Sequence, residues 1–487
     1  MNIRAPLALI LCLQLSTGAA QGLPDLGDAS AATLSETQER TIGNRIMREV
    51  RIDPAYVDDS EVADYIKALG NRLLSAADPP IRPIEFFVVQ DDTINAFALI
   101  GGHIGMHTGL ILLTRNEAEL AGVVGHEIAH ILQRHQSRMY QSQSKYQLAS
   151  LAALALAVLA SRGNNSQSGQ LTEAAIVSAS AIAMQGQLDY TREHEREADR
   201  VGVTILERAG YDPRGMVSFF ERMQRANRLS ELKSAPSYLR THPLTVERIA
   251  DMQSRVERMP AKLVPDSFEF RIARAKLRAT TGSPAEAVAY FRNQLADQTV
   301  LRPREDVYGL ALALRRARDF AAAEKELATL RAREAGVPAF ELLAAQLQAD
   351  QGRTAAALEA YRVALKSHPY HRGLVYGYAD LLIESGNTAE AIVWLDEKSR
   401  ASPDDAKLYE LQSRAFAVTG RRMAQHRAQA EAYFRRGNLA AAVDQLELAT
   451  KVRGSDYYEL STVEARLREL RSQLENEREA EKALKIS

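Results

Sequence analysis

The chain has 487 residues, which is too long for one ordinary hydrophobic core and predicts two or three folded units. Hydrophobic residues make up 46% of the sequence and charged residues 25%, proportions that argue against a disordered chain or a membrane-embedded body. The formal net charge is -1, so no basic excess points to nucleic acid, and we expect membrane association that is at most peripheral.

The first twenty residues have the pattern of a cleavable export signal. Arg4 gives the positive start, residues 5–13 the apolar stretch, and Gly18-Ala19-Ala20 the small-residue cleavage site. An uncleaved anchor is the alternative, but a spanning helix needs roughly 20 apolar residues. Cys12 is the single cysteine, so the mature chain must build any metal site from histidines and carboxylates.

The next part of the chain, which we assign to residues 21–262, mixes helical and extended patterns. Two amphipathic stretches precede a segment rich in β-branched and aromatic residues, and further helical stretches follow. We expect helices at 36–51, 59–76, 189–208 and up to about 229, and two or three short strands within 84–90 and 94–107.

A longer helix is expected after the strands. Thr114 and Glu117 match a capping box, and the apolar spacing continues to about His135. Before it, Gly101 and Gly102 would let a substrate backbone come close to the strands, as strand addition requires.

Residues 148–186 are rich in Ala, Leu, Ile and Ser and predict a helical hairpin. Its first arm, 148–160, is too short to span a bilayer. A pair of buried core helices is one interpretation, and a flap that contacts a partner or a membrane surface is the other.

Repeats follow, in a second part that we assign to residues 266–485. Ala287, Ala323, Ala357 and Ala391 recur at intervals of 36, 34 and 34 residues, each after a turn-forming residue. This spacing resembles the tetratricopeptide repeat, in which small residues let paired helices approach closely. A degenerate copy near Gly437 makes five candidate copies, and 464–484 is expected to be a charged helix that caps the stack or frays.

The sequence His126-Glu127-Ile128-Ala129-His130 carries the chemistry. On a helix its histidines lie one turn apart on one face and can hold one Zn²⁺ ion, while Glu127 can act as general base and acid. The motif alone also fits an ordinary solvated helix face. The helical context, the preceding strands, the export signal and the absence of other thiols favour a metal site.

A catalytic zinc needs a third protein ligand from elsewhere in the fold. We expect Glu195, with Asp199 four residues later on the same face to orient a ligating histidine. Residues alone leave Glu193, His194 and Glu197 as rivals, and a solvated charge run as the plain alternative. His103 and His107, on one face of a strand, are expected at the cleft edge rather than on the metal.

Together the motifs resemble a known family. Asn116-Glu117-Ala118-Glu119-Leu120-Ala121 leads into His126-Glu127-x-x-His130, and Glu195-x-x-Ala198-Asp199 follows, as in the gluzincin endopeptidases that include HtpX and the CAAX prenyl proteases. Those relatives are integral membrane proteins. The exported chain with C-terminal repeats is similar instead to the periplasmic proteases that assist β-barrel assembly.

The resemblance implies an α-rich α+β zincin domain with a small sheet, followed by an all-α tetratricopeptide-repeat solenoid. It implies zinc on His126, His130 and Glu195, and a switch role for His242 in Thr241-His242-Pro243-Leu244, where the histidine can take the fourth zinc position. Arg248 is expected to steady the oxyanion or the switch loop, or else to be a surface arginine.

The same resemblance implies a periplasmic endopeptidase for unfolded or stalled envelope proteins, whose repeats hold substrates or the β-barrel assembly machinery. The rival from another class is a zinc-stabilised chaperone or scaffold in which the repeats are the functional part. Intact Glu127 argues against it, because only catalysis requires a carboxylate there. An aminopeptidase is a weaker rival, since the strand before the zinc helix has no acidic exopeptidase motif.

Overall fold

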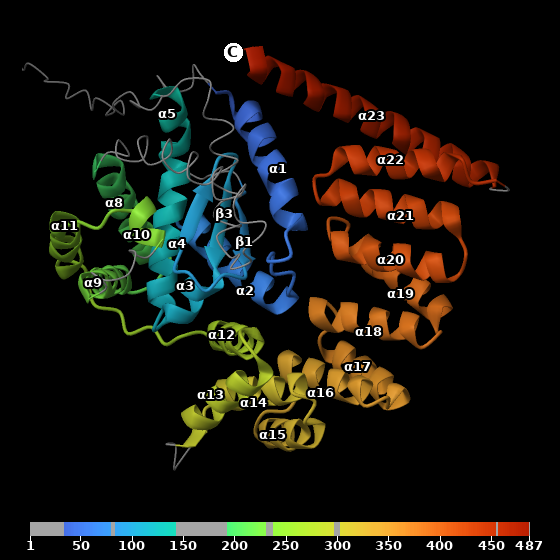
Figure 1. Ribbon diagram of the computed structural model, residues 1–487, viewed down its shortest axis with the longest axis horizontal. Coiled ribbons are helices and arrows are strands. Elements are labelled where there is room, and N and C mark those ends of the chain that lie inside the picture. Colours follow the sequence, from blue (N-terminus) through green and yellow to red (C-terminus); the bar gives the residue numbers. More distant parts are fainter. Residues whose placement is uncertain are drawn as a thin grey trace, which may run out of the picture.

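The computed structural model describes residues 34–78, 83–142, 192–229, 237–296, 302–453 and 456–486. The expected export signal and the expected 148–186 hairpin lie outside the described residues. Figure 1 shows an N-terminal part, α1 to α11 with a small sheet, beside an arc of helices from α12 to α23. In the parts of the chain that are described, no helix combines the length and apolar character that crossing a bilayer requires.

The sheet has three strands in the order β1-β3-β2. β1 (Glu85–Val89) runs parallel to the central strand β3 (His103–His107), and β2 (Ala96–Leu99) pairs with β3 antiparallel and forms an edge. The tight β2–β3 turn depends on Gly101 and Gly102, with φ values of 88° and 89° that favour glycine.

Helices cover both faces of this sheet because alternate strand residues point in opposite directions. Phe86 and Val88 enter the main core with α2 (Ser60–Ser75), whereas Phe87 and Val89 pack in a second core with α1 (Glu36–Ile52).

The β2–β3 turn also lies against α1. A side chain on Gly43 of α1 would clash with the carbonyl oxygen of Ile100, and one on Gly101 would lie 2.7 Å from Glu39 O. Gly101 therefore admits the close approach of α1, and the expected approach of a substrate backbone to Gly101 and Gly102 stays a prediction.

The helix after the sheet begins and ends at other residues than expected. α3 (Thr108–Leu113) comes first, and Thr114 donates its hydroxyl to Ile111 O instead of capping a long helix. α4 (Glu117–Leu132) is capped by Asn116, whose side chain accepts from Glu119 N at 2.9 Å. Arg134, in the left-handed region with φ 51°, separates α4 from α5 (His135–Ser142).

α4 crosses α8 (Arg192–Arg208) at two glycines. A Cβ on Gly202 would lie 3.1 Å from His126 N, and one on Gly125 would lie 3.3 Å from Gly202 O. This backbone contact brings the first turn of α8 beside the middle of α4. The N-terminal part is completed by α9 (Arg214–Leu229), α10 (Ser237–Thr241) and α11 (Val246–Glu257).

Twelve helices form the arc in the described residues. The expected small residues Ala287, Ala323, Ala357 and Ala391 are all buried between paired helices. The helices are α12 (Phe268–Thr280), α13 (Pro284–Ala296), α14 (Arg304–Arg316), α15 (Phe320–Arg333), α16 (Pro338–Asp350), α17 (Thr354–Ser367), α18 (Arg372–Glu384), α19 (Thr388–Ala401), α20 (Ala406–Val418), α21 (Arg422–Arg435), α22 (Leu439–Thr450) and α23 (Tyr457–Ile486).

The turns inside the helix pairs use left-handed residues. Gly282, Gly352 and Gly386 have positive φ, and Arg318 takes the same conformation with φ 62° in the second pair. Gly420, 34 residues after Gly386, has φ 71° and joins α20 to α21. The spacing of small residues did not predict this in-phase turn, because Gln425 stands where the other copies have an alanine five residues after the turn.

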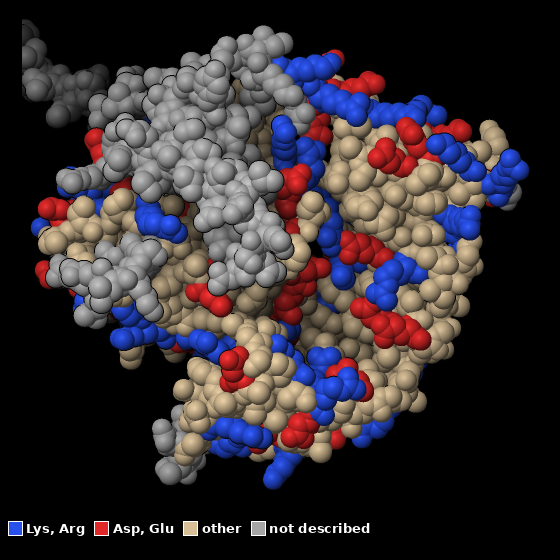
Figure 2. All heavy atoms as spheres, viewed as in Figure 1, with Lys and Arg blue, Asp and Glu red and all other residues tan. Residues whose placement is uncertain are grey.

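The two parts of the molecule touch at both ends of the arc. α12 contributes Phe270, Ala273 and Leu277 to the core of the N-terminal part, and its other face packs with the repeats. At the far end, Arg48 of α1 pairs with Glu477 of α23 at 2.9 Å. A cleft of about 990 Å³ lies between the parts, and acidic and basic side chains gather along it (Figure 2).

Candidate metal centre

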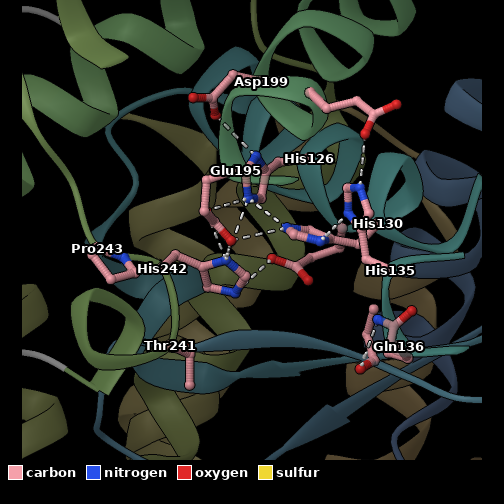
Figure 3. Close-up of polar contacts among 12 residues, drawn as sticks. His126, His130, His135, Gln136, Glu195, Asp199, Thr241, His242 and Pro243 are labelled. Atoms are coloured by element: carbon pink, nitrogen blue, oxygen red, sulfur yellow. Dashed lines mark hydrogen bonds and ion pairs between the residues drawn. The ribbon is translucent and has the colours of Figure 1, made fainter. Parts of the chain in front are cut away.

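The expected motif lies in the middle of α4, where His126 and His130 project from one face toward a common point (Figure 3). Both are buried, and their Nε2 atoms lie 3.0 Å apart. Glu195, in the first turn of α8, lies 3.4 Å from the Nε2 atom of each. Residues 65 positions apart thus converge, because α8 approaches α4 closely at the glycine crossing.

His242 completes this group from the segment between α10 and α11. Its Nδ1 lies 3.1 Å from Glu195 Oε1 and 3.3 Å from His126 Nε2. One ligand atom from each of His126, His130, Glu195 and His242 can be chosen so that all four lie within 4.8 Å of one another.

The chemistry of this donor set fits a divalent cation. The outer nitrogen Nδ1 of His126 faces Asp199 Oδ1 at 3.1 Å, and that of His130 faces His135 Nδ1 at 2.8 Å. With their outer nitrogens occupied, the rings direct Nε2 lone pairs at one another and at a carboxylate. Lone pairs at 3.0 Å repel unless a proton or a cation lies between them.

Arg248 of α11 binds the carboxylates behind the group. Its Nε and Nη2 each lie 2.8 Å from Asp199, and its Nη1 lies 2.9 Å from Glu195 Oε2 and 2.7 Å from Pro243 O. The side chain is 1% exposed, so the surface-arginine interpretation is wrong. A solvated charge run is equally wrong for Glu195 and Asp199, each 1% exposed.

Proton affinities at the centre reflect this pairing. Burial opposes charge on Asp199, but Arg248 and His126 outweigh it and lower the pKa of Asp199. Burial also opposes charge on Glu195, yet the surrounding histidines hold its pKa well below the ordinary value. Burial opposes protonation of His126, but Asp199 and Glu195 raise its pKa to about 9. A proton and a metal ion therefore compete for His126.

Glu127 is 1% exposed and lies on the far side of His242 from Glu195. Its Oε1 is 3.5 Å from His242 Nε2, whereas His242 Nδ1 faces Glu195 and His126. The imidazole of His242 thus lies between the metal group and the carboxylate expected to act as base.

His242 is held in place from three sides. Its ring stacks on Tyr238 with centroids 4.8 Å apart, and its backbone nitrogen donates to Tyr238 O at 2.8 Å. Arg248 holds the next residue, Pro243, through its carbonyl oxygen. This geometry ties the loop of His242 to the same guanidinium that binds Asp199.

Other candidates from the sequence lie off the metal group. His103 pairs with Glu85 at 3.0 Å and lines the cleft between the two parts. His107 is 1% exposed and bonds to Thr93 at 2.7 Å, so it is a core residue and not at the cleft edge. Of the rivals to Glu195, Glu197 contacts His135 at 3.2 Å and His194 stacks on the same ring.

Comparison with known proteins agrees with this architecture. Residues 60–256 match the family model of peptidase family M48, and residues 308–372 and 348–415 match tetratricopeptide-repeat models. The "Beta-barrel assembly-enhancing protease" of Escherichia coli (strain K12) is 31% identical over 456 residues, 93% of this chain and 92% of that protein. Its namesake from Yersinia pestis is 31% identical over 486 residues, 98% of this chain and 99% of that protein.

A more distant relative matches a shorter stretch of the chain. The "Mitochondrial metalloendopeptidase OMA1" of Schizosaccharomyces pombe is 27% identical over 189 residues, which cover 39% of this chain and 51% of that protein.

A buried histidine-glutamate metal group on crossed helices, followed by helical repeats, defines a metalloendopeptidase with C-terminal tetratricopeptide repeats. Within that class, the chain belongs to the family of the β-barrel assembly-enhancing proteases, and its residues 60–256 match peptidase family M48. The fold class and the family expected from the sequence are confirmed.

Proposed function

We propose that the protein is a zinc endopeptidase in which His126, His130 and Glu195 hold the ion. The observation that carries this proposal is the convergence of these three buried side chains, with His242, on one point. Two imidazoles and one carboxylate are a common ligand set of catalytic zinc. The proposal includes the division into a peptidase domain, 21–262, and a repeat domain, 266–485.

When bound, zinc would polarise the scissile carbonyl and favour deprotonation of the attacking water. Glu127 then accepts a proton from that water and donates it to the leaving amine. Asp199 orients His126 through the 3.1 Å contact at Nδ1. Arg248 holds Asp199 and Glu195, and a direct contact of Arg248 with the oxyanion would require its bond to Pro243 O to break.

His242 is proposed as a self-inhibitory ligand. Its ring is within 3.5 Å of Glu127 and 3.3 Å of His126, so it fills the space that the reacting carbonyl and water need. Cleavage therefore requires the 241–243 loop to move, which breaks the Tyr238 stacking and the Arg248–Pro243 bond.

The biological role is proposed from the relatives. Two of them are named for the enhancement of β-barrel assembly, and residues 1–20 have the pattern of an export signal. We place this chain in the periplasm, degrading misfolded or stalled envelope proteins. Residues of the repeats line one side of the charged cleft. The repeats are proposed to bind substrates or the β-barrel assembly machinery, with chaperone activity as a further role.

A scaffold function without catalysis is the second candidate. The observation that favours it is the blocked position of Glu127 behind His242. In that case zinc would stabilise the fold and the repeats would do the work.

Zinc content and casein cleavage of four proteins test the proposal. Glu127→Gln should keep zinc and lose cleavage, Glu195→Ala should lose zinc, and His242→Ala should cleave faster than the wild type. Removing a general base costs roughly 10²–10⁴-fold in rate. If Glu127→Gln cleaves casein and supports envelope assembly like the wild type, the scaffold function replaces the endopeptidase.

A further inference from the structure

The two histidines of the zinc motif have different neighbours behind them. His126 faces the carboxylate of Asp199 directly, whereas His130 faces another imidazole, that of His135. His135 is 0% exposed, lies 2.8 Å from His130 through the two Nδ1 atoms, and lies 3.2 Å from Glu197 through Nε2. None of the reactions described above uses His135.

The break between α4 and α5 creates this contact. On a continuous helix His135 would point about 140° away from His130, because five residues advance the helix by 1.4 turns. Instead, Arg134 adopts φ 51° and donates its backbone N–H to Ile131 O at 3.0 Å, so α5 starts in a new direction. His135, the first residue of α5, is thereby turned back under His130.

The direction of the hydrogen bonds follows from the chemistry of neutral imidazole. A histidine that binds a cation through Nε2 carries its proton on Nδ1, so His130 donates from Nδ1. His135 accepts at Nδ1, and its own proton is then on Nε2, from which it donates to Glu197. The two contacts, 2.8 Å to His130 and 3.2 Å to Glu197, place an acceptor and a donor of the neutral His135 ring where this arrangement needs them.

We propose that His135 is the positioning residue of the ligand His130 and connects it to Glu197. This inference rests on the zinc site proposed above. His135 fixes the tautomer and the ring orientation of His130, and His194 fixes the plane of His135 by stacking at a centroid distance of 4.5 Å and an angle of 24°.

The connection through His135 to Glu197 gives His130 a weaker carboxylate partner than the one that His126 has. Asp199 is buried and lies directly behind His126, whereas Glu197 has a side chain 37% exposed and reaches His130 only through a neutral ring. Arg138 also approaches Glu197, at 3.6 Å. His130 is therefore the less polarised of the two ligands.

Equilibrium zinc affinity, measured by competition with a chelator, tests the proposal. His135→Leu removes the acceptor and should weaken zinc binding roughly 10–100-fold. His135→Asn places an amide oxygen near the position of Nδ1 and should restore most of the affinity. His135→Gln, whose amide extends toward Glu197, should not. The absorption bands of the Co²⁺-loaded protein should change with Leu and Gln but stay close to those of the wild type with Asn.

The matched control is His107→Leu, since His107 is equally buried but lies off the metal group and should leave zinc affinity unchanged. Wild-type affinity in His135→Leu, with zinc lost in Glu195→Ala, would overturn the positioning role and leave the zinc site standing. Undiminished zinc binding in Glu195→Ala would overturn the zinc site itself. If His135→Leu does not fold, equal affinities of the Asn and Gln variants decide against the proposal.

Discussion

Two charged regions of this molecule differ in how deeply their charged side chains are buried. At the metal centre Asp199, Glu195 and Arg248 are each about 1% exposed, and these two carboxylates each have several partners. Between the two parts of the chain, most ion pairs are more open to solvent: Arg372 and Asp64, 2.6 Å apart, have side chains 38% and 47% exposed.

The second region gathers around the start of α2. Its acidic residues meet cations from repeats far apart in the sequence, on α12, α18, α20 and the turn after α21. The pairs are Lys276 with Asp59 and Glu61, Arg372 with Asp64, and Lys407 and Arg436 with Asp58.

This contrast indicates where charge can be altered without loss of the fold. Removing one member of a buried ion pair leaves an uncompensated charge, whereas a solvent-exposed pair is screened and contributes little. At the metal centre, therefore, each buried charge depends on its partners. In the contact between the parts, single exposed charges can be changed at little cost in stability.

The largest effect is expected at Arg248. Arg248→Leu leaves the buried carboxylates of Asp199 and Glu195 without their cation, and the free energy of unfolding should fall by about 3–5 kcal/mol. Urea denaturation followed by circular dichroism, at a fixed zinc concentration, measures it. Arg240→Leu, at an exposed site on α10, is the control and should change stability by less than about 0.5 kcal/mol. A loss below about 1 kcal/mol at Arg248 would show that the buried carboxylates do not depend on its charge.

Lys276 should be intermediate, because it is the most buried of the interface cations, with its side chain 14% exposed. Burial opposes its charge, but Glu61 and Asp59 raise its pKa. Lys276→Met should cost about 1.5–3 kcal/mol, the range for hydrogen bonds to charged groups. A double-mutant cycle with Glu61→Gln should give a coupling above about 0.5 kcal/mol, and simple additivity would contradict the contact.

Glu85, near the same cleft, should make stability depend on pH. Burial raises its pKa, but His103 and Arg51 outweigh burial and lower the pKa to about 2. A carboxylate with a depressed folded-state pKa stabilises the protein fully above its ordinary value of 4.5 and loses that contribution as the pH falls toward 2. Glu85→Gln should therefore destabilise the protein at pH 7, and its effect should shrink below pH 4.5 and disappear only below pH 2.

Denaturation of the Glu85→Gln variant and the wild type across this range measures the prediction. The effect is moderated by solvent screening, because the side chain is 35% exposed. A variant whose stability deficit is constant from pH 7 to pH 2 would rule out the charge as its cause.

The smallest effects are expected at the exposed pairs. Arg372→Gln and Lys407→Gln should each cost less than about 1 kcal/mol. At 1 M salt, where the Debye length is about 3 Å, each variant should match the wild type in thermal midpoint. A cost comparable to that of Arg248→Leu would erase the distinction between the two regions.

The same distinction explains what the sequence could predict. His126, Glu127 and His130 lie within one helical turn, so a local motif is enough to find them. Glu195 is 65 residues further on, and the rival Glu197 could be set aside in advance only through family resemblance. The burial of Arg248 was not predictable, because its partner Asp199 lies 49 positions earlier and only the fold brings them together.

Helix ends were predicted less well than helices, for a physical reason. Thr114 and Asn116 are both good capping residues, and the structure uses Thr114 to end α3 and Asn116 to begin α4. Nothing local distinguishes Arg134 as left-handed, since most non-glycine residues avoid that conformation. The break between α4 and α5, which turns His135 toward His130, was therefore not predicted.

Finally, α12 belongs to two cores at once. The repeats are therefore not joined to the N-terminal part by a flexible linker alone. Their first helix packs in both cores, so any bending of the arc must occur further along, between later helix pairs. A load applied at the far repeats would reach the N-terminal part through α12, through the ion pairs that α18, α20 and the turn after α21 make with the start of α2, and through the α1–α23 contact.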